Sequence, residues 1–217
     1  MKNFVFCIAL LFFACQVTVA NRFELAHLET MKLEGVGYTA YHYDNDGGGT
    51  KAGITFKRFK QIVASEKDLR LFDADKDGVI TKNDHRKMTM GRIKYIYKKY
   101  YWDAVNGDKI ESELVARLMY DYLVNGGFNI RKFQTVVGVK PDGKFGAQTV
   151  SAINKYDHCK LSKAILKDRG AWLLKVMPRT RPATYRACKN GWKNRLNYFV
   201  SQFKTKCKNE KLGYFTV

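Results

Sequence analysis

The chain is short of acidic residues. Its 217 residues include 39 Lys and Arg but only 20 Asp and Glu, which gives a formal net charge of +19 at pH 7. An excess of this size implies an anionic partner, such as nucleic acid, a membrane surface or an anionic polymer. A hydrophobic fraction of 46% excludes a disordered chain and is enough for the core of one sizeable domain.

Long apolar runs are absent after the first twenty residues, so we expect no transmembrane segment. At the start of the chain, Lys2 precedes an apolar run over residues 4–14, and small residues follow. This pattern is typical of a secretory signal peptide over residues 1–20. A lipoprotein signal with a lipidated Cys15 is the less favoured alternative. Export to a secreted or periplasmic location disfavours nucleic acid as the partner and favours an anionic cell wall.

Cysteine is scarce in the predicted mature chain, where Cys159, Cys188 and Cys207 remain. No two of them have the C-x-x-C spacing that is typical of a metal site. An odd number of cysteines permits at most one internal disulfide within the chain, and the sequence leaves the pairing open.

The sequence has no internal repeat and no low-complexity linker, and most of its apolar residues recur at helical spacing. Residues 38–55 are the exception, because they are rich in Gly, Asp, Asn and Tyr and predict a short β element. Helices are predicted over residues 21–33, 56–72, 89–100 with Thr89 as N-cap, 110–125, 128–137, 146–156, 161–176 before Pro178 and Pro182, and 191–203. We therefore predict a mainly α fold, a helical bundle with a small β element near the N-terminus.

Glu34 stands at the C-terminal end of the first predicted helix, which Gly35 ends. The partial negative charge of a helix C-terminus and partial burial both favour the protonated form of a carboxyl group. A general acid that works near neutral pH needs this form. The ordinary alternative is a surface Glu near a helix end.

Six groups of short motifs surround or follow Glu34. They are Glu34-Gly35, Gly47-Gly48-Gly49-Thr50 with Gly53-Ile54-Thr55, Tyr101-Trp102-Asp103, Asp121 with Asn125-Gly126-Gly127, a segment from Gln134 to Ile153, and Gly191-Trp192 with Asn194-Arg195. Their order over residues 23–200 resembles glycoside hydrolase family 108, the bacterial and phage N-acetylmuramidases. The resemblance implies a lysozyme-like α+β fold and cleavage between N-acetylmuramic acid and N-acetylglucosamine. It also implies that Glu34 is the catalytic acid.

Glycoside hydrolysis normally uses two carboxylates. The chain departs from the family pattern beside the candidate for the second one, because Val36 replaces a Gly and the Gly-rich turn has two extra residues. The family's Asp therefore aligns with Asp44, Asn45 or Asp46. Asp46 is favoured because it directly precedes the Gly run, and Thr50 is a candidate to hold the water. The ordinary role of Asp in such a turn is capping.

Arg117, Asp121 and Asn125 recur every four residues and form a polar stripe on a predicted apolar helix. The resemblance implies that this stripe is a buried network on the floor of the substrate cleft, where Asp121 and Asn125 support substrate binding. It also makes Tyr101 and Trp102 candidate substrate contacts.

Residues 73–84 fit the spacing of an EF-hand calcium loop, with Gly78 at the sixth position where the chain turns sharply. The predicted ligands are Asp73, Asp75, Asp77, Val79 through its backbone carbonyl, and Asp84. The departure is Asp84 at position twelve, where a longer Glu normally supplies two oxygens. We predict one structural Ca²⁺ and no cofactor for the chemistry itself; the alternative is an acidic turn between helices.

Together these features predict a signal peptide, a lysozyme-like catalytic lobe over residues 21–127, and a peptidoglycan-binding-like helical lobe over residues 128–217 of the same domain. We expect an exported, monomeric muramidase that binds peptidoglycan and anionic wall polymers, and no nucleic acid. A non-catalytic peptidoglycan-binding protein and a glycanase acting on chitin or another amino-sugar polymer are the alternatives. The predicted basic C-terminal face comprises Lys189, Lys193, Arg195, Lys204, Lys206, Lys208 and Lys211.

Overall fold

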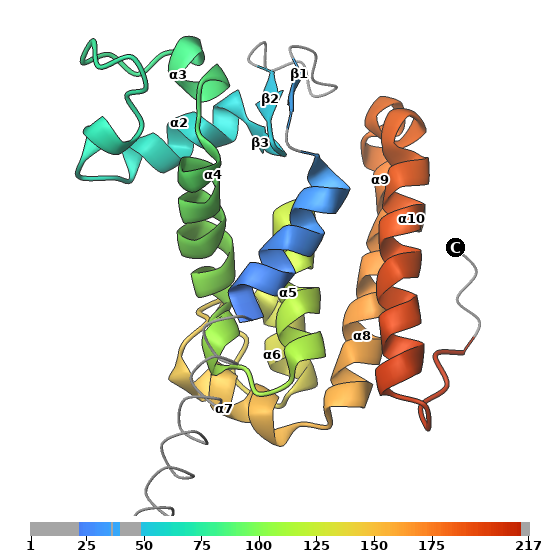
Figure 1. Ribbon diagram of the computed structural model, residues 1–217. Coiled ribbons are helices and arrows are strands. Elements are labelled where there is room, and N and C mark those ends of the chain that lie inside the picture. The colour runs from blue at the N-terminus through green and yellow to red at the C-terminus, as the bar shows by residue number, and fades with distance from the viewer. Residues whose placement is uncertain (1–21, 36, 40–48, 214–217) are drawn as a thin grey trace, which may run out of the picture.

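The computed structural model describes residues 22–35, 37–39 and 49–213 (Figure 1). Helices dominate these residues, and a small antiparallel sheet lies near their N-terminal end, which confirms the predicted mainly α, lysozyme-like fold class. The sheet has the order β1 (Tyr38–Thr39), β2 (Thr50–Lys51) and β3 (Ile54–Thr55). The predicted signal peptide and Cys15 lie outside the described residues.

The first helix covers residues 22–34. The later α-helices are α2 (Phe56–Ala64), α3 (Lys82–Arg86), α4 (Met90–Tyr97), α5 (Glu113–Asn125), α6 (Ile130–Val136), α7 (Ala147–Lys155), α8 (His158–Ala171), α9 (Met177–Thr180) and α10 (Pro182–Lys206). Two π-helical segments extend helices: η2 (Lys98–Trp102) follows α4, and η5 (Trp172–Val176) joins α8 to α9. Short 3₁₀ turns are η1 (Leu69–Leu71), η3 (Asp103–Val105) and η4 (Gly107–Lys109).

Hydroxyl side chains cap the helices that surround the candidate site. Thr55, the last residue of β3, accepts a hydrogen bond from Arg58 N (3.1 Å), so the sheet runs directly into α2. Thr89 caps α4 as predicted, and Ser112 caps α5. Each cap provides a partner for a backbone N–H that has no acceptor within the helix.

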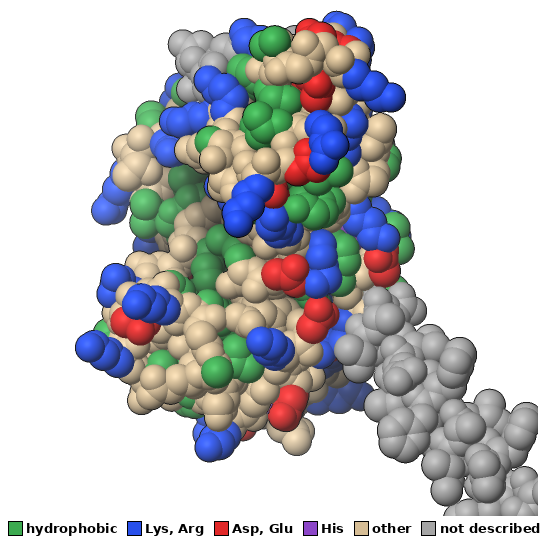
Figure 2. Space-filling model, turned by 90° about the vertical axis from the view of Figure 1, so that its left-hand side faces the viewer, with side chains coloured by type: hydrophobic (Ala, Val, Ile, Leu, Met, Phe, Trp, Pro, Cys, Tyr) green, Lys and Arg blue, Asp and Glu red, His purple; other side chains and the backbone are tan. Residues whose placement is uncertain are grey.

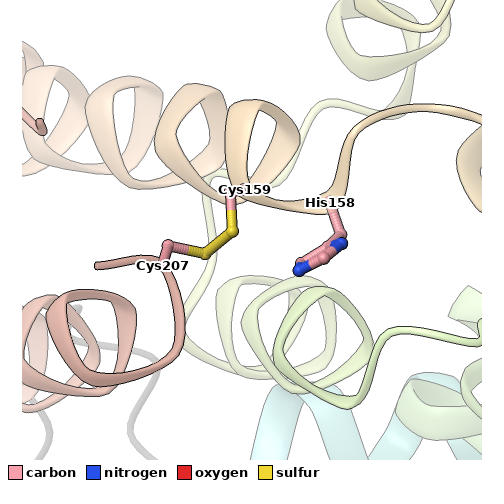
Figure 3. Close-up of side chains that lie close together, drawn as sticks. All are labelled: His158, Cys159 and Cys207. Carbon is pink, nitrogen blue, oxygen red and sulfur yellow. A yellow bond between two sulfur atoms is a disulfide. The ribbon is translucent and has the colours of Figure 1, made fainter. Parts of the chain in front are cut away.

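The last helix is longer than predicted. It begins at Pro182 rather than at Gly191, because proline fits the first helical turn, where its missing N–H costs no hydrogen bond. A disulfide between Cys159 and Cys207 joins the start of α8 to the end of α10, with a Cα–Cα distance of 5.6 Å (Figure 3). This bridge fits the prediction of at most one internal disulfide and assigns the pairing that the sequence left open.

One hydrophobic core connects the two predicted lobes. Helix α5 is buried from Leu114 to Tyr122 and packs against both α8 and α10. Among the core residues are Phe23, Phe59, Ile96, Leu118, Phe133, Leu166 and Phe199. None of the described helices is long and apolar enough to cross a bilayer.

Candidate active site

Glu34 is the last residue of the first helix, as the sequence predicted. Gly35 follows with φ +74°, a left-handed conformation that suits glycine, and its N–H donates to Met31 O at 2.9 Å. The Glu34 side chain keeps 16% of its surface exposed. The helix end therefore presents a partly buried carboxyl group that a ligand can still reach.

Gly53, in the turn between β2 and β3, faces Glu34. A Cβ atom at this position would lie 2.8 Å from Glu34 Oε2 and 2.7 Å from Tyr97 Oη, and the φ of +78° also favours glycine. The Gly-Ile-Thr motif therefore lets the sheet approach the carboxyl group closely. Tyr97 closes this side of the site and donates a hydrogen bond to Ala52 O at 2.9 Å.

Tyr97 stays neutral in this position. Burial, and then the nearby charge of Glu34, raise the pKa of Tyr97 well above its ordinary value. The phenol therefore remains protonated and acts as a hydrogen-bond donor at neutral pH. It contributes no charge to the surroundings of Glu34.

Arg195 of α10 contacts Glu34 from the other side. Its Nη1 lies 2.5 Å from Glu34 Oε1, and its Nε donates to Asp121 Oδ1 at 2.7 Å. Although burial lowers the pKa of Arg195, the two carboxylates raise it above its ordinary value. Arg195 is therefore a permanent cation beside the Glu34 carboxyl group.

Asp121 lies behind Arg195 and is almost wholly buried. Its Oδ2 lies 2.5 Å from Arg169 Nη1, and Arg169 also donates to Asn125 Oδ1 at 3.3 Å. At Asp121 the polar stripe on α5 is therefore a buried network, which the half-buried Asn125 joins through Arg169. Arg117 belongs to a separate group, since it pairs with Glu29, Glu113 and Tyr198.

The burial of two side chains contradicts predictions made from the sequence. Trp102 has no exposed surface, and its Nε1 donates to Asp108 Oδ1 at 2.7 Å. The prediction that Trp102 contacts the substrate is therefore wrong, because the whole side chain packs within the hydrophobic core. Arg195, predicted on the exposed basic face, is buried instead. Tyr101 keeps 9% of its surface and accepts a hydrogen bond from Arg58 Nε at 3.3 Å.

Three residues in or next to the Gly-rich turn are predicted to act with Glu34, and the structure describes one of them, Thr50. Asp44 and Asp46 lie outside the described residues, and a catalytic role for either one stays a prediction. Thr50 lies in β2, opposite Thr55 of β3. Its hydroxyl oxygen is buried and has no hydrogen-bond partner among the residues that the structure describes.

The acidic loop over residues 73–84 brings three of its predicted ligands together. Carboxylate oxygens of Asp73, Asp75 and Asp84 lie within 4.8 Å of one another. Asp84 also caps α3: one oxygen accepts from Thr81 N at 2.8 Å and the other from Ala74 N at 2.7 Å. Although burial raises the pKa of Asp84, these hydrogen bonds hold it below its ordinary value. Asp77, the remaining carboxylate of the motif, accepts a hydrogen bond from Val79 N.

A small sheet against a helical bundle, with a partly buried Glu at the helix end beside it, is a lysozyme-like arrangement. Family comparison agrees: the glycosyl hydrolase 108 model matches residues 28–127, and a predicted peptidoglycan domain matches residues 129–197. These two matches indicate a glycoside hydrolase that acts on peptidoglycan.

Comparison with solved structures supports the same assignment. The structure of SagA from Brucella abortus is 26% identical in sequence, with a TM-score of 0.60. The match covers 84% of this chain and 94% of the SagA chain. A comparison with curated proteins finds no match.

Proposed function

We propose that the chain is an exported muramidase that hydrolyses the bond between N-acetylmuramic acid and N-acetylglucosamine, with Glu34 as the general acid. The observation that carries this proposal is the placement of Glu34. It combines residual exposure with contacts to Gly53 on one side and Arg195 on the other. Glu34 protonates the leaving oxygen, and Arg195 then stabilises the carboxylate that remains.

A second carboxylate completes the reaction in this proposal. Asp46, or Asp44 in its place, either attacks the sugar or activates a water molecule. Thr50 supports the second possibility, because buried hydroxyl groups in proteins normally have a partner and its hydroxyl has none among the described residues. A water molecule bound there would satisfy it.

The loop over residues 73–84 binds one structural Ca²⁺ in this proposal. Hard oxygen ligands in a cluster of this size suit a calcium ion, and the carboxylates of Asp73, Asp75 and Asp84 converge. Asp84 accepts hydrogen bonds from Ala74 N at one oxygen and from Thr81 N and Oγ1 at the other, so a metal bound there would replace or share one of these contacts. Asp77 and the Val79 carbonyl are the remaining ligands that the motif supplies.

Export is supported by the disulfide and by the surface charge. The Cys159–Cys207 bridge is typical of an oxidising compartment outside the cytosol. Lys and Arg side chains spread over the face of the molecule in Figure 2. Exposed lysines on and after α10 suit attraction to peptidoglycan and anionic wall polymers; they are Lys189, Lys204, Lys206, Lys208 and Lys211.

Digestion of purified peptidoglycan tests the proposed function. The wild type is expected to release new reducing ends, and Glu34→Gln to lower the rate by about 10² to 10⁴-fold, the usual contribution of a general acid. Glu24→Gln is the matched control, because Glu24 lies on the same helix and forms an exposed ion pair with Lys94. It should retain the wild-type rate.

The products decide between the proposal and its alternatives. Mass spectrometry of borohydride-reduced products should find reduced N-acetylmuramic acid at the new ends. Reduced N-acetylglucosamine would refute the assigned bond. Faster cleavage of chitin oligomers than of peptidoglycan would favour the other amino-sugar polymer. A wild type that releases no reducing ends from either polymer would favour a non-catalytic binding protein.

A further inference from the structure

Four charged side chains form a buried row that ends at Glu34. Arg169 of α8 contacts Asp121 of α5, Asp121 contacts Arg195 of α10, and Arg195 contacts Glu34, each across 2.5 to 2.6 Å. We infer that Arg195, held by Asp121 and Arg169, is a positioning residue that fixes the place and the charge of the Glu34 carboxyl group. This inference rests on the proposed function, in which Glu34 is the general acid.

Different nitrogen atoms of the Arg195 guanidinium group contact Asp121 and Glu34. Its Nε donates a hydrogen bond to Asp121 Oδ1 at 2.7 Å, and its Nη2 lies 2.6 Å from the same oxygen as an ion pair without hydrogen-bond geometry, which leaves Nη1 for Glu34. Contacts on two neighbouring nitrogens orient a guanidinium group more firmly than a single contact does. Arg169 Nη1 forms an ion pair with the other oxygen of Asp121 at 2.5 Å. The position of Glu34 Oε1 is therefore set by side chains from three helices.

The charges in the row also balance. With Glu34 ionised, two arginines face two carboxylates; with Glu34 protonated, the row carries one excess positive charge. Unbalanced charge is costly where side chains are buried, and Asp121, Arg169 and Arg195 keep 4% or less of their surface. Arg195 therefore favours the ionised form of Glu34, whereas Asp121 favours the protonated form. The two residues act on Glu34 with opposite signs.

Asp44 and Asp46 lie outside the described residues; among those that are described, the other titratable groups that interact with Glu34 are two neutral tyrosines. Tyr97 faces it from α4 and Tyr120 from α5. Burial is the main reason why the pKa of each lies far above its ordinary value. Among the described residues, the charged groups that act most directly on Glu34 are therefore Arg195, which contacts it, and Asp121, which contacts Arg195.

Both arginines come from the segment that matches the predicted peptidoglycan domain, residues 129–197. Glu34 and Asp121 come from the hydrolase segment, residues 28–127. The helices that carry Arg169 and Arg195 lie side by side (Figure 1), and the Cys159–Cys207 disulfide joins them. The second segment therefore completes the catalytic site, in addition to any part that it has in binding the wall.

Titration of Glu34 in variants of the full chain tests the inference. The readouts are the alkaline limb of the kcat/KM pH profile on solubilised peptidoglycan and ¹³C NMR of the Glu34 carboxyl group, assigned with Glu34→Gln. We expect Arg195→Gln to move both to higher pH by about one unit or more, as for the loss of an adjacent cation. Asp121→Asn should move both to lower pH. Arg117→Gln removes a buried arginine outside the row and should move neither.

Arg195→Lys keeps the charge and covers the case in which Arg195→Gln does not fold. Lysine cannot reproduce the contacts to two partners, so the titration of Glu34 should stay near the wild-type pH while kcat falls at least tenfold. An unchanged kcat in Arg195→Lys, or shifts of the same sign in Arg195→Gln and Asp121→Asn, would overturn the inference. If the NMR titrations move as expected but the wild type releases no reducing ends, the inference holds and the proposed muramidase function fails.

Discussion

At the scale of single residues, a substitution at Gly53 tests whether catalysis requires the close approach of the sheet to Glu34. Gly53→Ala adds a Cβ atom 2.8 Å from Glu34 Oε2 at a φ of +78°. Left-handed strain alone costs about 1 to 3 kcal/mol, and the overlap displaces the carboxyl group. We expect kcat to fall at least tenfold, measured by release of reducing ends, with the change in stability measured by denaturant unfolding.

Gly138→Ala is the matched control for Gly53→Ala. Gly138 has a similar φ of +77°, and no atom lies within 4 Å of a Cβ built there. This variant should lose comparable stability and keep full activity. Equal kcat values for Gly53→Ala and the wild type would show that contact between the sheet and Glu34 is not needed for catalysis.

The residues of the site were predictable to the extent that short motifs carry them. Glu34 followed from its motif and from the helix that ends at Gly35. Arg195 was present in a motif, but its role was missed because its partner Glu34 lies 161 positions away in the sequence. Trp102 was misassigned because its role was taken from the resemblance of Tyr101-Trp102-Asp103 to a family motif. A motif match does not tell whether a side chain lies in the core or at the surface.

At the scale of elements, the loop over residues 73–84 is the clearest test of calcium binding. A ligand that binds the folded chain raises the melting temperature. We expect added Ca²⁺ to raise the Tm of the wild type and a chelator to reverse the change, measured by scanning calorimetry. Asp75→Asn should reduce the shift, because it removes one ligand while Asp84 still caps α3.

Asp103→Asn serves as the control for calcium binding. Asp103 pairs with Lys98 outside the loop, so the variant should respond to Ca²⁺ as the wild type does. A wild-type Tm that is the same in Ca²⁺ and in chelator would leave the loop as an acidic turn stabilised by its own hydrogen bonds.

The disulfide between α8 and α10 stabilises the pair of helices that carries Arg169 and Arg195. It closes a loop between residues 48 positions apart. Removing a bridge of this kind typically costs about 2 to 4 kcal/mol, through the entropy of the unfolded chain. We expect Cys159→Ser combined with Cys207→Ser to lower the free energy of unfolding by that amount, measured with guanidinium chloride. Cys188→Ser leaves the bridge in place and should lower the free energy of unfolding by clearly less than the double replacement does, because Cys188 is only half-buried and lies outside the bridge.

Helix boundaries were predicted best where the sequence contains a cap. Thr89 fixed the start of α4, and Gly35 fixed the end of the first helix. The start of α10 was missed, because proline was interpreted as a break although it can also open a helix. Pro182 does open α10, which then continues through Gly191, because packing against α8 and α9 outweighs the low helix propensity of glycine.

At the scale of the whole molecule, the fold class and the resemblance to a glycoside hydrolase family were accessible from the sequence, whereas the contacts between the two segments were not. Helical periodicity and the order of the motifs are local properties, and they predicted a mainly α hydrolase with a small sheet. The buried row from Arg169 to Glu34 depends on how α5, α8 and α10 pack together. Packing at that level follows from long-range contacts that no single stretch of sequence contains.

The net positive charge of the molecule predicts that its binding to cell walls depends on salt. A formal charge of +19 creates a field that attracts anionic polymers, and salt screens this field. Binding of Glu34→Gln to purified cell walls, measured by co-sedimentation, should weaken at least tenfold as ionic strength rises from low to about 0.5 M. Replacement of Lys204, Lys208 and Lys211 by Gln should flatten this dependence, while kcat on small soluble fragments stays unchanged, because all three are exposed outside the site. Binding that is insensitive to salt would show that the wall is held by contacts with sugar and peptide, and that the basic surface has another role.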